Sequence, residues 1–245
     1  MRMIISPAKK MVGEAPLPHH DLPVCIERAE RLRNLIRSLS YAEQKRLWAC
    51  SDSIAAQNSE RFAHMDLRCN PTPALLAFDG IQYTYMAPAV FEDVHLAYVQ
   101  DHLRILSGFY DVLRPFNGVV PYRLEMQAKA AVDGFRNLYD FWGESLYGEV
   151  VDDGRVIVNL ASKEYSKAIE KHLGPNDTFI TCIFGELEGG KVVQKGVYAK
   201  IARGEMVRFL AGVQAEEPDQ LKGFAWSGYV FDEKRSTDTS FVFVR

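Results

Sequence analysis

The polar run Pro121-Tyr-Arg-Leu-Glu-Met126 places an arginine and a glutamate two residues apart. Side chains two residues apart in an extended chain lie on the same side, so we expect Arg123 and Glu125 to point in one direction. One interpretation is that these two charges pair with each other. The alternative is that Arg123 binds a phosphate or a carboxylate through its two-pronged donor group while Glu125 orients it.

A second polar run, Asn159-Leu-Ala-Ser-Lys-Glu-Tyr165, leads into a stretch with helical periodicity. Ser162 is most simply the N-cap of that helix, because a serine side chain can accept a hydrogen bond from an amide of the first turn. The alternative interpretation makes Asn159, Lys163 and Tyr165 polar groups of a pocket.

Six polar residues are our candidates for catalytic groups: Lys9, Asp79, Arg123, Glu125, Asn159 and Tyr165. A deep pocket in which a carboxyl group with a raised pKa faces a lysine amine would favour an enzyme that acts on a DNA base or a nucleotide. Side chains that pair off on opposite sides of a filled core would argue against such an enzyme. The sequence leaves the catalytic question open.

Positive charge is concentrated in one segment near the end of the chain. Residues 191–210 contain five basic residues and one acidic residue. A helix expected from about Val197 to Val213 would carry its apolar residues on one side. The other side would display Lys200, Arg203, Gly204 and Arg208. This basic side either binds phosphates or is an ordinary solvated face.

Two apolar stretches flank a Ser-Gly pair between Leu103 and Pro115. A glycine allows the left-handed backbone that ends a helix sharply, so the segment is typical of a helix-hairpin-helix element. The turn amides of such an element can bind phosphate oxygens without contacting bases, and Arg104 and Arg114 would add positive charge. The alternative is a corner between two buried helices.

Hydrophobic periodicity predicts the elements that must position these residues. We expect a short strand at Ile4-Ile5, a loop over residues 6–23, and helices between Cys25 and Met65, one of them starting with a capping box at Ser40. Further helices are expected at about 91–105, 138–147 and after Ser162, and strands at 155–158, 178–184, 225–231 and 240–244. Helices thus predominate at about 24–147 and strands at about 150–245, which predicts an α+β (mixed α/β) fold in one domain over residues 1–245.

The overall composition is that of a soluble globular protein. The 245 residues are 47% hydrophobic and 25% charged, and the net charge of −3 argues against a protein that is basic throughout. The charge is unevenly distributed, however, with a net +4 over residues 191–210 and a net −2 over residues 214–245. A basic surface confined to one region therefore remains compatible with the sequence.

No motif for a cofactor or a metal is present. The sequence has neither a glycine-rich nucleotide loop nor an H-E-x-x-H motif, and its histidines and cysteines do not have metal-ligand spacing. We therefore expect no cofactor and no metal. The chain has no C-x-x-C pair, apolar leader or membrane-length apolar run, which predicts a cytoplasmic protein without membrane contact.

A series of motifs occurs in order along the chain: Ile5-Ser-Pro-Ala-Lys9, Phe78-Asp-Gly80, His102-Leu-Arg-Ile-Leu-Ser-Gly-Phe-Tyr110, Leu113-Arg-Pro115, Pro121-Tyr-Arg-Leu-Glu-Met126, Asn159-Leu-Ala-Ser162 with Glu164-Tyr165, Ala199-Lys-Ile-Ala-Arg-Gly204 and Gly228-Tyr229. Together they resemble the bacterial YaaA family of peroxide-stress resistance proteins. The resemblance implies a cytosolic protein with a mixed α/β fold peculiar to the family and a helix-hairpin-helix element beside a basic cleft. It also implies DNA binding and a role in limiting damage when hydrogen peroxide meets free intracellular iron, without an established reaction.

By position, the resemblance puts the hairpin at Leu106–Tyr110. It puts the family's repeated polar residues at Lys9, Asp79, Arg114, Arg123, Glu125, Lys200 and Arg203. Two departures stand out. Ile81-Gln82 follows Phe-Asp-Gly where the family often has an acidic residue, and Asp111 stands where the family often has glycine. A negative charge at Asp111 would weaken phosphate binding by the hairpin.

We therefore expect a monomeric DNA-binding protein of the peroxide stress response that contacts the phosphate backbone largely without sequence preference. Its partner would be duplex DNA or distorted or single-stranded DNA. The expected DNA contacts are Leu106, Ser107, Gly108, Tyr110, Arg114, Lys195, Lys200, Arg203 and Arg208. Two alternatives stay open: an enzyme acting on a DNA base or a nucleotide in a polar pocket beside the basic cleft, and an iron-handling protein with carboxylate ligands.

Overall fold

A mostly parallel β-sheet runs through the middle of the protein, whose structure is a computed structural model describing residues 1–245. The strand order is β11-β12-β9-β8-β1-β5-β6, with β10 paired to β9. The five inner strands are parallel: β12 (Ser240–Val244), β9 (Thr178–Glu188), β8 (Val156–Leu160), β1 (Arg2–Ile5) and β5 (Leu103–Ser107). The strands that pair antiparallel at its margins are β11 (Val230–Phe231), β6 (Asp111–Leu113) and β10 (Lys191–Val193).

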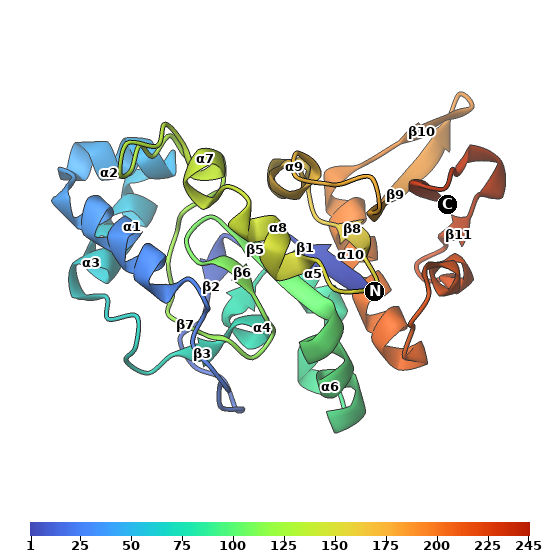
Figure 1. Cartoon of the computed structure of the whole chain (residues 1–245), viewed down its shortest axis with the longest axis horizontal. Helices are drawn as coiled ribbons and strands as arrows, with labels where there is room; N and C mark the ends of the chain where they lie inside the picture. Colours follow the sequence, from blue (N-terminus) through green and yellow to red (C-terminus); the bar gives the residue numbers. More distant parts are fainter.

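Helices surround this sheet and form a separate cluster at one end of the molecule (Figure 1). The end cluster is α1 (Ile26–Ser38), α2 (Tyr41–Trp48) and α3 (Asp52–His64). The others are α4 (Ala74–Ala77), α5 (Ile81–Met86), α6 (Asp93–His102), α7 (Leu138–Trp142), α8 (Ser145–Val150), α9 (Lys163–Glu170) and α10 (Gly196–Val213), with 3₁₀ turns at Pro88–Val90, Pro218–Gly223 and Glu233–Arg235. None of the helices combines the length and the apolar character needed to cross a membrane.

Two small antiparallel sheets join loops to the main body. Strand β2 (Lys10–Met11) pairs with β4 (Phe78–Asp79), which brings the segment after β1 beside the start of α5. Strand β3 (Thr72–Pro73) pairs with β7 (Gly118–Val119). The first of these pairs fixes the loop that carries Lys9 and Lys10.

The mixed α/β class and most of the predicted elements are confirmed. The opening strand, the three helices between Cys25 and Met65, and the strands β8, β9 and β12 all lie where the sequence pattern placed them. The capping box at Ser40 is formed in both directions with Glu43. The strands are nevertheless not confined to the second half, since β1, β5 and β6 belong to the same sheet as β8, β9 and β12.

The predicted helix-hairpin-helix element is instead a β-hairpin. Helix α6 ends at His102, and β5 and β6 then pair antiparallel with Ser107 opposite Asp111. Every residue of β5 is buried. A short, continuously buried strand has the same apolar appearance as a buried helix, and periodicity cannot separate the two. The prediction was wrong for this reason.

Gly108 in this hairpin allows a close backbone approach. A Cβ atom there would lie 2.7 Å from the carbonyl oxygen of Leu124 and 2.9 Å from the backbone of Glu125. The indole of Trp142 donates a hydrogen bond of 3.0 Å to the Gly108 carbonyl oxygen. The hairpin turn therefore packs directly against the backbone of the polar run 121–126.

Helix α10 packs closely against α5 through Gly204. A Cβ atom at Gly204 would lie only 2.1 Å from the carbonyl oxygen of Gln82 and 2.9 Å from the amide nitrogen of Met86. Gly204 is thus buried between the two helices, whereas the sequence predicted that it would lie on the exposed basic side of α10. Without a side chain at this position, α5 and α10 can lie in backbone contact.

Candidate functional site

A polar cavity of about 410 Å³ lies where the parallel strands β1 and β8 end. Ile5 pairs with Leu160 at this edge, so Ser6 and Ser162 enter the cavity one or two residues after the strands. In the sheet, β5 lies beside β1 on one side, whereas β8 and then β9 lie on its other side. The strand order therefore reverses its direction between β1 and β8. Ligands of open α/β sheets bind at such a reversal of strand order, outside the carboxyl ends of the strands. We call this cavity the polar pocket.

Eight charged side chains contribute to the lining of the polar pocket: Lys9, Lys10, Asp79, Arg123, Glu125, Glu164, Lys200 and Arg203. The sequence predicted six of these as catalytic candidates or DNA contacts. Lys10 and Glu164 were not among the candidates. Residues from five separate parts of the chain thus converge on one site, although no pattern in the sequence showed that they would meet.

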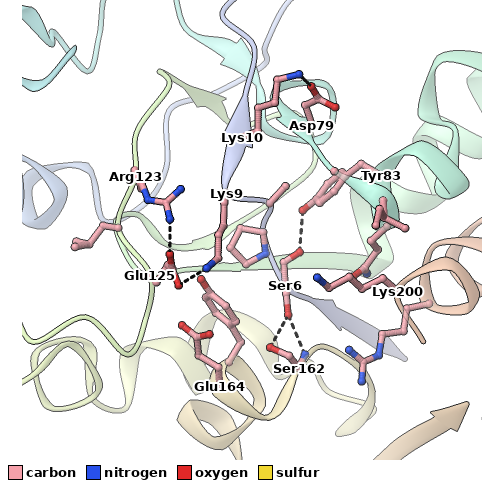
Figure 2. Close-up of a pocket in the computed structure, with 18 of the residues that line it drawn as sticks. Ser6, Lys9, Lys10, Asp79, Tyr83, Arg123, Glu125, Ser162, Glu164 and Lys200 are labelled. Carbon is pink, nitrogen blue, oxygen red and sulfur yellow. Dashed lines mark hydrogen bonds and ion pairs between the residues drawn. The ribbon is translucent and has the colours of Figure 1, made fainter. Parts of the chain in front are cut away.

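Ser6 and Ser162 link the two strand ends at the floor of the pocket (Figure 2). The Ser162 amide donates a 2.9 Å hydrogen bond to Ser6 Oγ, and Ser6 Oγ donates to Ser162 Oγ over 3.2 Å. The hydroxyl of Tyr83 donates to the Ser6 carbonyl oxygen over 3.1 Å. Ser162 does occupy the N-cap position of α9, but its side chain makes no capping hydrogen bond. Its hydroxyl belongs to the pocket.

The Glu125 carboxylate is shared by two cations on one wall of the pocket. Lys9 Nζ lies 2.8 Å from Oε2, and Arg123 Nη2 donates to Oε1 over 3.0 Å. The predicted pairing of Arg123 with Glu125 is therefore confirmed. Burial differs greatly among the three groups, since the Lys9 side chain is 64% exposed and that of Arg123 only 12%. Lys9 is the member of this group that is most open to solvent.

Asp79 is held by Lys10 rather than by Lys9. The two residues lie directly opposite each other in the β2–β4 pair, and their side chains form an ion pair. Neighbouring residues of an extended chain point to opposite sides. Lys9 and Lys10 accordingly reach two different carboxylates across the pocket.

Glu164 is a functional candidate that the sequence pattern did not single out. It lies in the first turn of α9, is half-buried, and accepts a 3.2 Å hydrogen bond on Oε1 from the Gln127 amide. Burial raises the pKa of its carboxyl group, and the negative charge of Glu125 raises this pKa further. No lysine or arginine forms an ion pair with it. Its place between Ser162 and Tyr165 in a polar run was the available signal.

Lys200 and Arg203 form the opposite wall and have no acidic partner. They lie three residues apart on α10, a spacing that puts both on one helix face. The Arg203 side chain is partly buried, which lowers the pKa of its guanidinium group, and its Nε atom has no hydrogen-bond partner. In Figure 2, Lys200 lies across Ser6 from Lys9 and Glu125.

The hairpin residues predicted to contact DNA are inside the protein. Leu106, Ser107 and Tyr110 are fully buried. The amides of Phe109 and Tyr110 donate to Ser107 Oγ over 3.1 and 2.9 Å, so they are not free for phosphate oxygens. Because these residues are buried inside the protein, the prediction that Leu106, Ser107, Gly108 and Tyr110 contact DNA was wrong.

The remaining predicted residues lie outside the polar pocket. Arg114, Lys195 and Arg208 are exposed, and Lys195 forms ion pairs with Glu186 and Glu188. Asn159 is buried in β8, where its side-chain amide donates to Thr181 Oγ1 over 3.2 Å. Tyr165, by contrast, lines the pocket.

The fold and the site together define a mixed α/β protein with a charged pocket at the carboxyl edge of its parallel strands. His, Cys, Asp and Glu side chains do not gather in groups of three that could hold a metal ion. The family model described as "Peroxide stress protein YaaA" matches residues 1–235. The chain belongs to this family.

Relatives in several bacteria match over the full length. The chain is 52% identical to a UPF0246 protein of Agathobacter rectalis over 246 residues, covering 100% of this chain and 99% of the relative. It is 51% identical to a UPF0246 protein of Desulfitobacterium hafniense and 48% identical to one of Pediococcus pentosaceus, each covering 100% of this chain and 98% of the relative. The resemblance to the YaaA family is thereby confirmed.

Proposed function

We propose that this protein acts in the peroxide stress response by binding the phosphate backbone of DNA, largely without sequence preference, with Lys200 and Arg203 as the central contacts. Family membership supports the role in peroxide stress. In this proposal the protein acts in the cytoplasm as a monomer, on duplex or distorted DNA. By covering the backbone it limits damage from iron and peroxide.

The absence of acidic partners at Lys200 and Arg203 is the observation that carries this proposal. The other three cations of the pocket all form ion pairs with carboxylates, Lys9 and Arg123 with Glu125 and Lys10 with Asp79. A positive charge without a nearby carboxylate attracts an anion more strongly, and a guanidinium group can hold a phosphate with two hydrogen bonds. The two side chains share one helix face, as two contacts to one backbone require.

Salt titration of DNA binding tests the proposal. Each lost phosphate contact lowers the slope of log K against log salt by about 0.9, so changing both Lys200 and Arg203 to glutamine is expected to reduce the slope by about 1.8. The matched control is Arg46→Gln, an exposed charge on α2 at the far end of the molecule (Figure 1). The proposal would be refuted if the affinity for DNA did not depend on salt concentration, or if the double variant bound DNA as the unaltered protein does.

A second candidate function is an enzyme that acts on a DNA base or a nucleotide. The convergence of Lys9, Asp79, Arg123, Glu125 and Tyr165 on one cavity supports it. Its test is mass spectrometry of nucleotides and of damaged DNA after incubation with the protein. A product that disappears in Glu125→Gln would support catalysis, and unchanged substrates throughout would count against it.

A further inference from the structure

Three charged groups of the polar pocket have no charged partner, and they lie on different walls. Lys200 and Arg203 come from α10, whereas Glu164 comes from α9 and accepts its one side-chain hydrogen bond from a neutral amide, that of Gln127, with Lys9 and Lys167 near enough to act on its charge without forming an ion pair. The other charges pair within the protein. A complementary ligand carries negative charge at one end and N–H donors at the other.

We propose that the polar pocket binds a single nucleotide whose base carries an amino group. Its phosphate lies at Lys200 and Arg203, and the amino group of its base donates to Glu164. The inference rests on the proposed function, because the two cations that hold the DNA backbone also hold this phosphate. It adds the identity of the ligand that enters the same site.

The cationic wall is suited to a phosphate. Arg203 retains an unsatisfied, buried Nε donor, and burial of its charge without a carboxylate is unfavourable until an anion arrives. Lys200 is exposed one helical turn away and adds a flexible second charge. Together the two groups can neutralise the double negative charge of a terminal phosphate.

The acidic wall is suited to an amino group. Only Oε1 of Glu164 accepts a hydrogen bond within the protein, so the second oxygen of this pocket-lining carboxylate is left without a donor. Glu125 beside it is already occupied by Lys9 and Arg123. Adenine, cytosine and guanine each carry an exocyclic amino group, whereas thymine offers a carbonyl oxygen in its place. A carbonyl oxygen facing the carboxylate would be repelled.

The dimensions agree with a ligand of this size. The cavity volume of about 410 Å³ falls within the range of roughly 300 to 1,000 Å³ that is usual for small-molecule sites. In Figure 2, Glu164 lies on the same side of Ser6 as Lys9, and Lys200 lies on the other. The two ends of the ligand are thus recognised by opposite walls, which fixes its orientation.

Two sources could supply this ligand: a free nucleoside monophosphate, and an unpaired nucleotide within a DNA strand. Calorimetric titration with the monophosphates of deoxyadenosine, deoxycytidine, deoxyguanosine and thymidine, and with inorganic phosphate, tests the first source. Titration with a duplex that contains one unpaired adenine, and with the same duplex fully paired, tests the second.

The expected result is selectivity that depends on Glu164. Because a hydrogen bond to a charged acceptor is stronger than one to a neutral acceptor, the amino-bearing nucleotides should bind about tenfold more tightly than thymidine monophosphate or phosphate. Glu164→Gln should abolish most of this preference. The control is Glu14→Gln, an exposed carboxylate outside the pocket. The selectivity of the unaltered protein is informative even if a variant fails to fold.

Different failures point to different conclusions. If the protein binds paired duplex through Lys200 and Arg203 but binds neither free nor unpaired nucleotides, the inference is wrong and the proposed function stands. If all four nucleotides bind equally and Glu164→Gln has no effect, the role of Glu164 is overturned. If nucleotides bind with the expected preference while duplex DNA does not bind, the proposed function fails and the nucleotide site is retained for the free ligand.

Discussion

The carboxyl group of Asp111 is buried at the start of β6 and forms no ion pair, although Arg28 lies near enough to lower its pKa slightly against the effect of burial. Its Oδ2 accepts hydrogen bonds from Cys25 Sγ at 3.1 Å and Ser145 Oγ at 2.9 Å, while its buried Oδ1 has no partner. Burial raises the pKa of this carboxyl group to about 6. The residue also has a φ of 72°, a conformation that glycine adopts without strain. The positive φ therefore fits a position where relatives often have glycine.

Stability should therefore fall as pH rises through the titration of Asp111. The folded protein holds this proton up to about pH 6, whereas an unfolded aspartate releases it near pH 4. The contribution is present below pH 4 and is lost between about pH 4 and 6, by up to about 3 kcal/mol for a shift of two units. Denaturant unfolding at pH 4 and 7 measures this effect as the difference between the protein and Asp111→Asn. A difference that stays constant over this range would show that Asp111 does not titrate as described.

Glu164 shows how far the sequence could lead at the scale of single residues. Lys9, Asp79, Arg123, Glu125 and Tyr165 are predictable as candidates because they cluster within motifs that are too polar to form only core. Glu164 belongs to a helix start, where an acidic residue is expected for the helix alone. Its position opposite α10 depends on the place of β8 in the sheet and on the direction in which α9 leaves that strand. No local sequence pattern carries this information.

At the scale of elements, the contact between α5 and α10 places Lys200 and Arg203 at the pocket. Gly204→Ala would force a methyl group to within 2.1 Å of a backbone oxygen. We expect a loss of stability of about 3 kcal/mol and weaker DNA binding, because the backbone must move apart. Gly212→Ala in the same helix is the control, since a Cβ atom there meets nothing within 4 Å.

The two substitutions should therefore have opposite effects. Alanine at Gly212 is expected to stabilise the protein by up to about 1 kcal/mol, through helix propensity alone. Thermal or denaturant unfolding of both variants makes the comparison. Equal effects would mean that the backbone contact at Gly204 does not restrict the packing of α10.

The β5–β6 hairpin is the element whose type the sequence pattern predicted wrongly. Amphipathic helices such as α1 and α9 were recognisable because one face is polar. The run from Leu103 to Leu113 is buried on both faces, so its strand pairing is decided by partners elsewhere, β1 above all. Ser107 and Gly108, predicted as the hinge of a helix-hairpin-helix element, instead support residues 121–126, since Ser107 hydrogen-bonds to Tyr122 and Gly108 allows the backbone at Leu124 and Glu125 to approach.

At the scale of the whole molecule, a single core joins both halves of the chain. Sixty-two buried residues form one cluster that contains residues from α1 to β12. We therefore expect one cooperative unfolding transition with coincident curves from circular dichroism and from fluorescence of Trp48, Trp142 and Trp226. Two separated transitions would show that the α1–α3 cluster folds independently.

The net charge of −3 looked unfavourable for a DNA-binding protein. For the proposed DNA binding this value alone is a poor guide, because five of the eight charged side chains of the polar pocket form ion pairs with one another. Two cations on α10 remain unpaired, and it is their position that matters. A total summed over the chain does not contain this information.

Strand β1 cannot complete its place in the sheet until β5 and β8, which come much later in the chain, have been synthesised. Met3 pairs with Leu103 on one side and with Val158 on the other. During translation this apolar strand leaves the ribosome long before either partner exists, and it cannot be buried in the sheet until β8 has been made. Contacts between residues so far apart in sequence form slowly, and exposed strand edges tend to aggregate. The nascent chain is therefore expected to depend on chaperones until β8 is available to pair with β1.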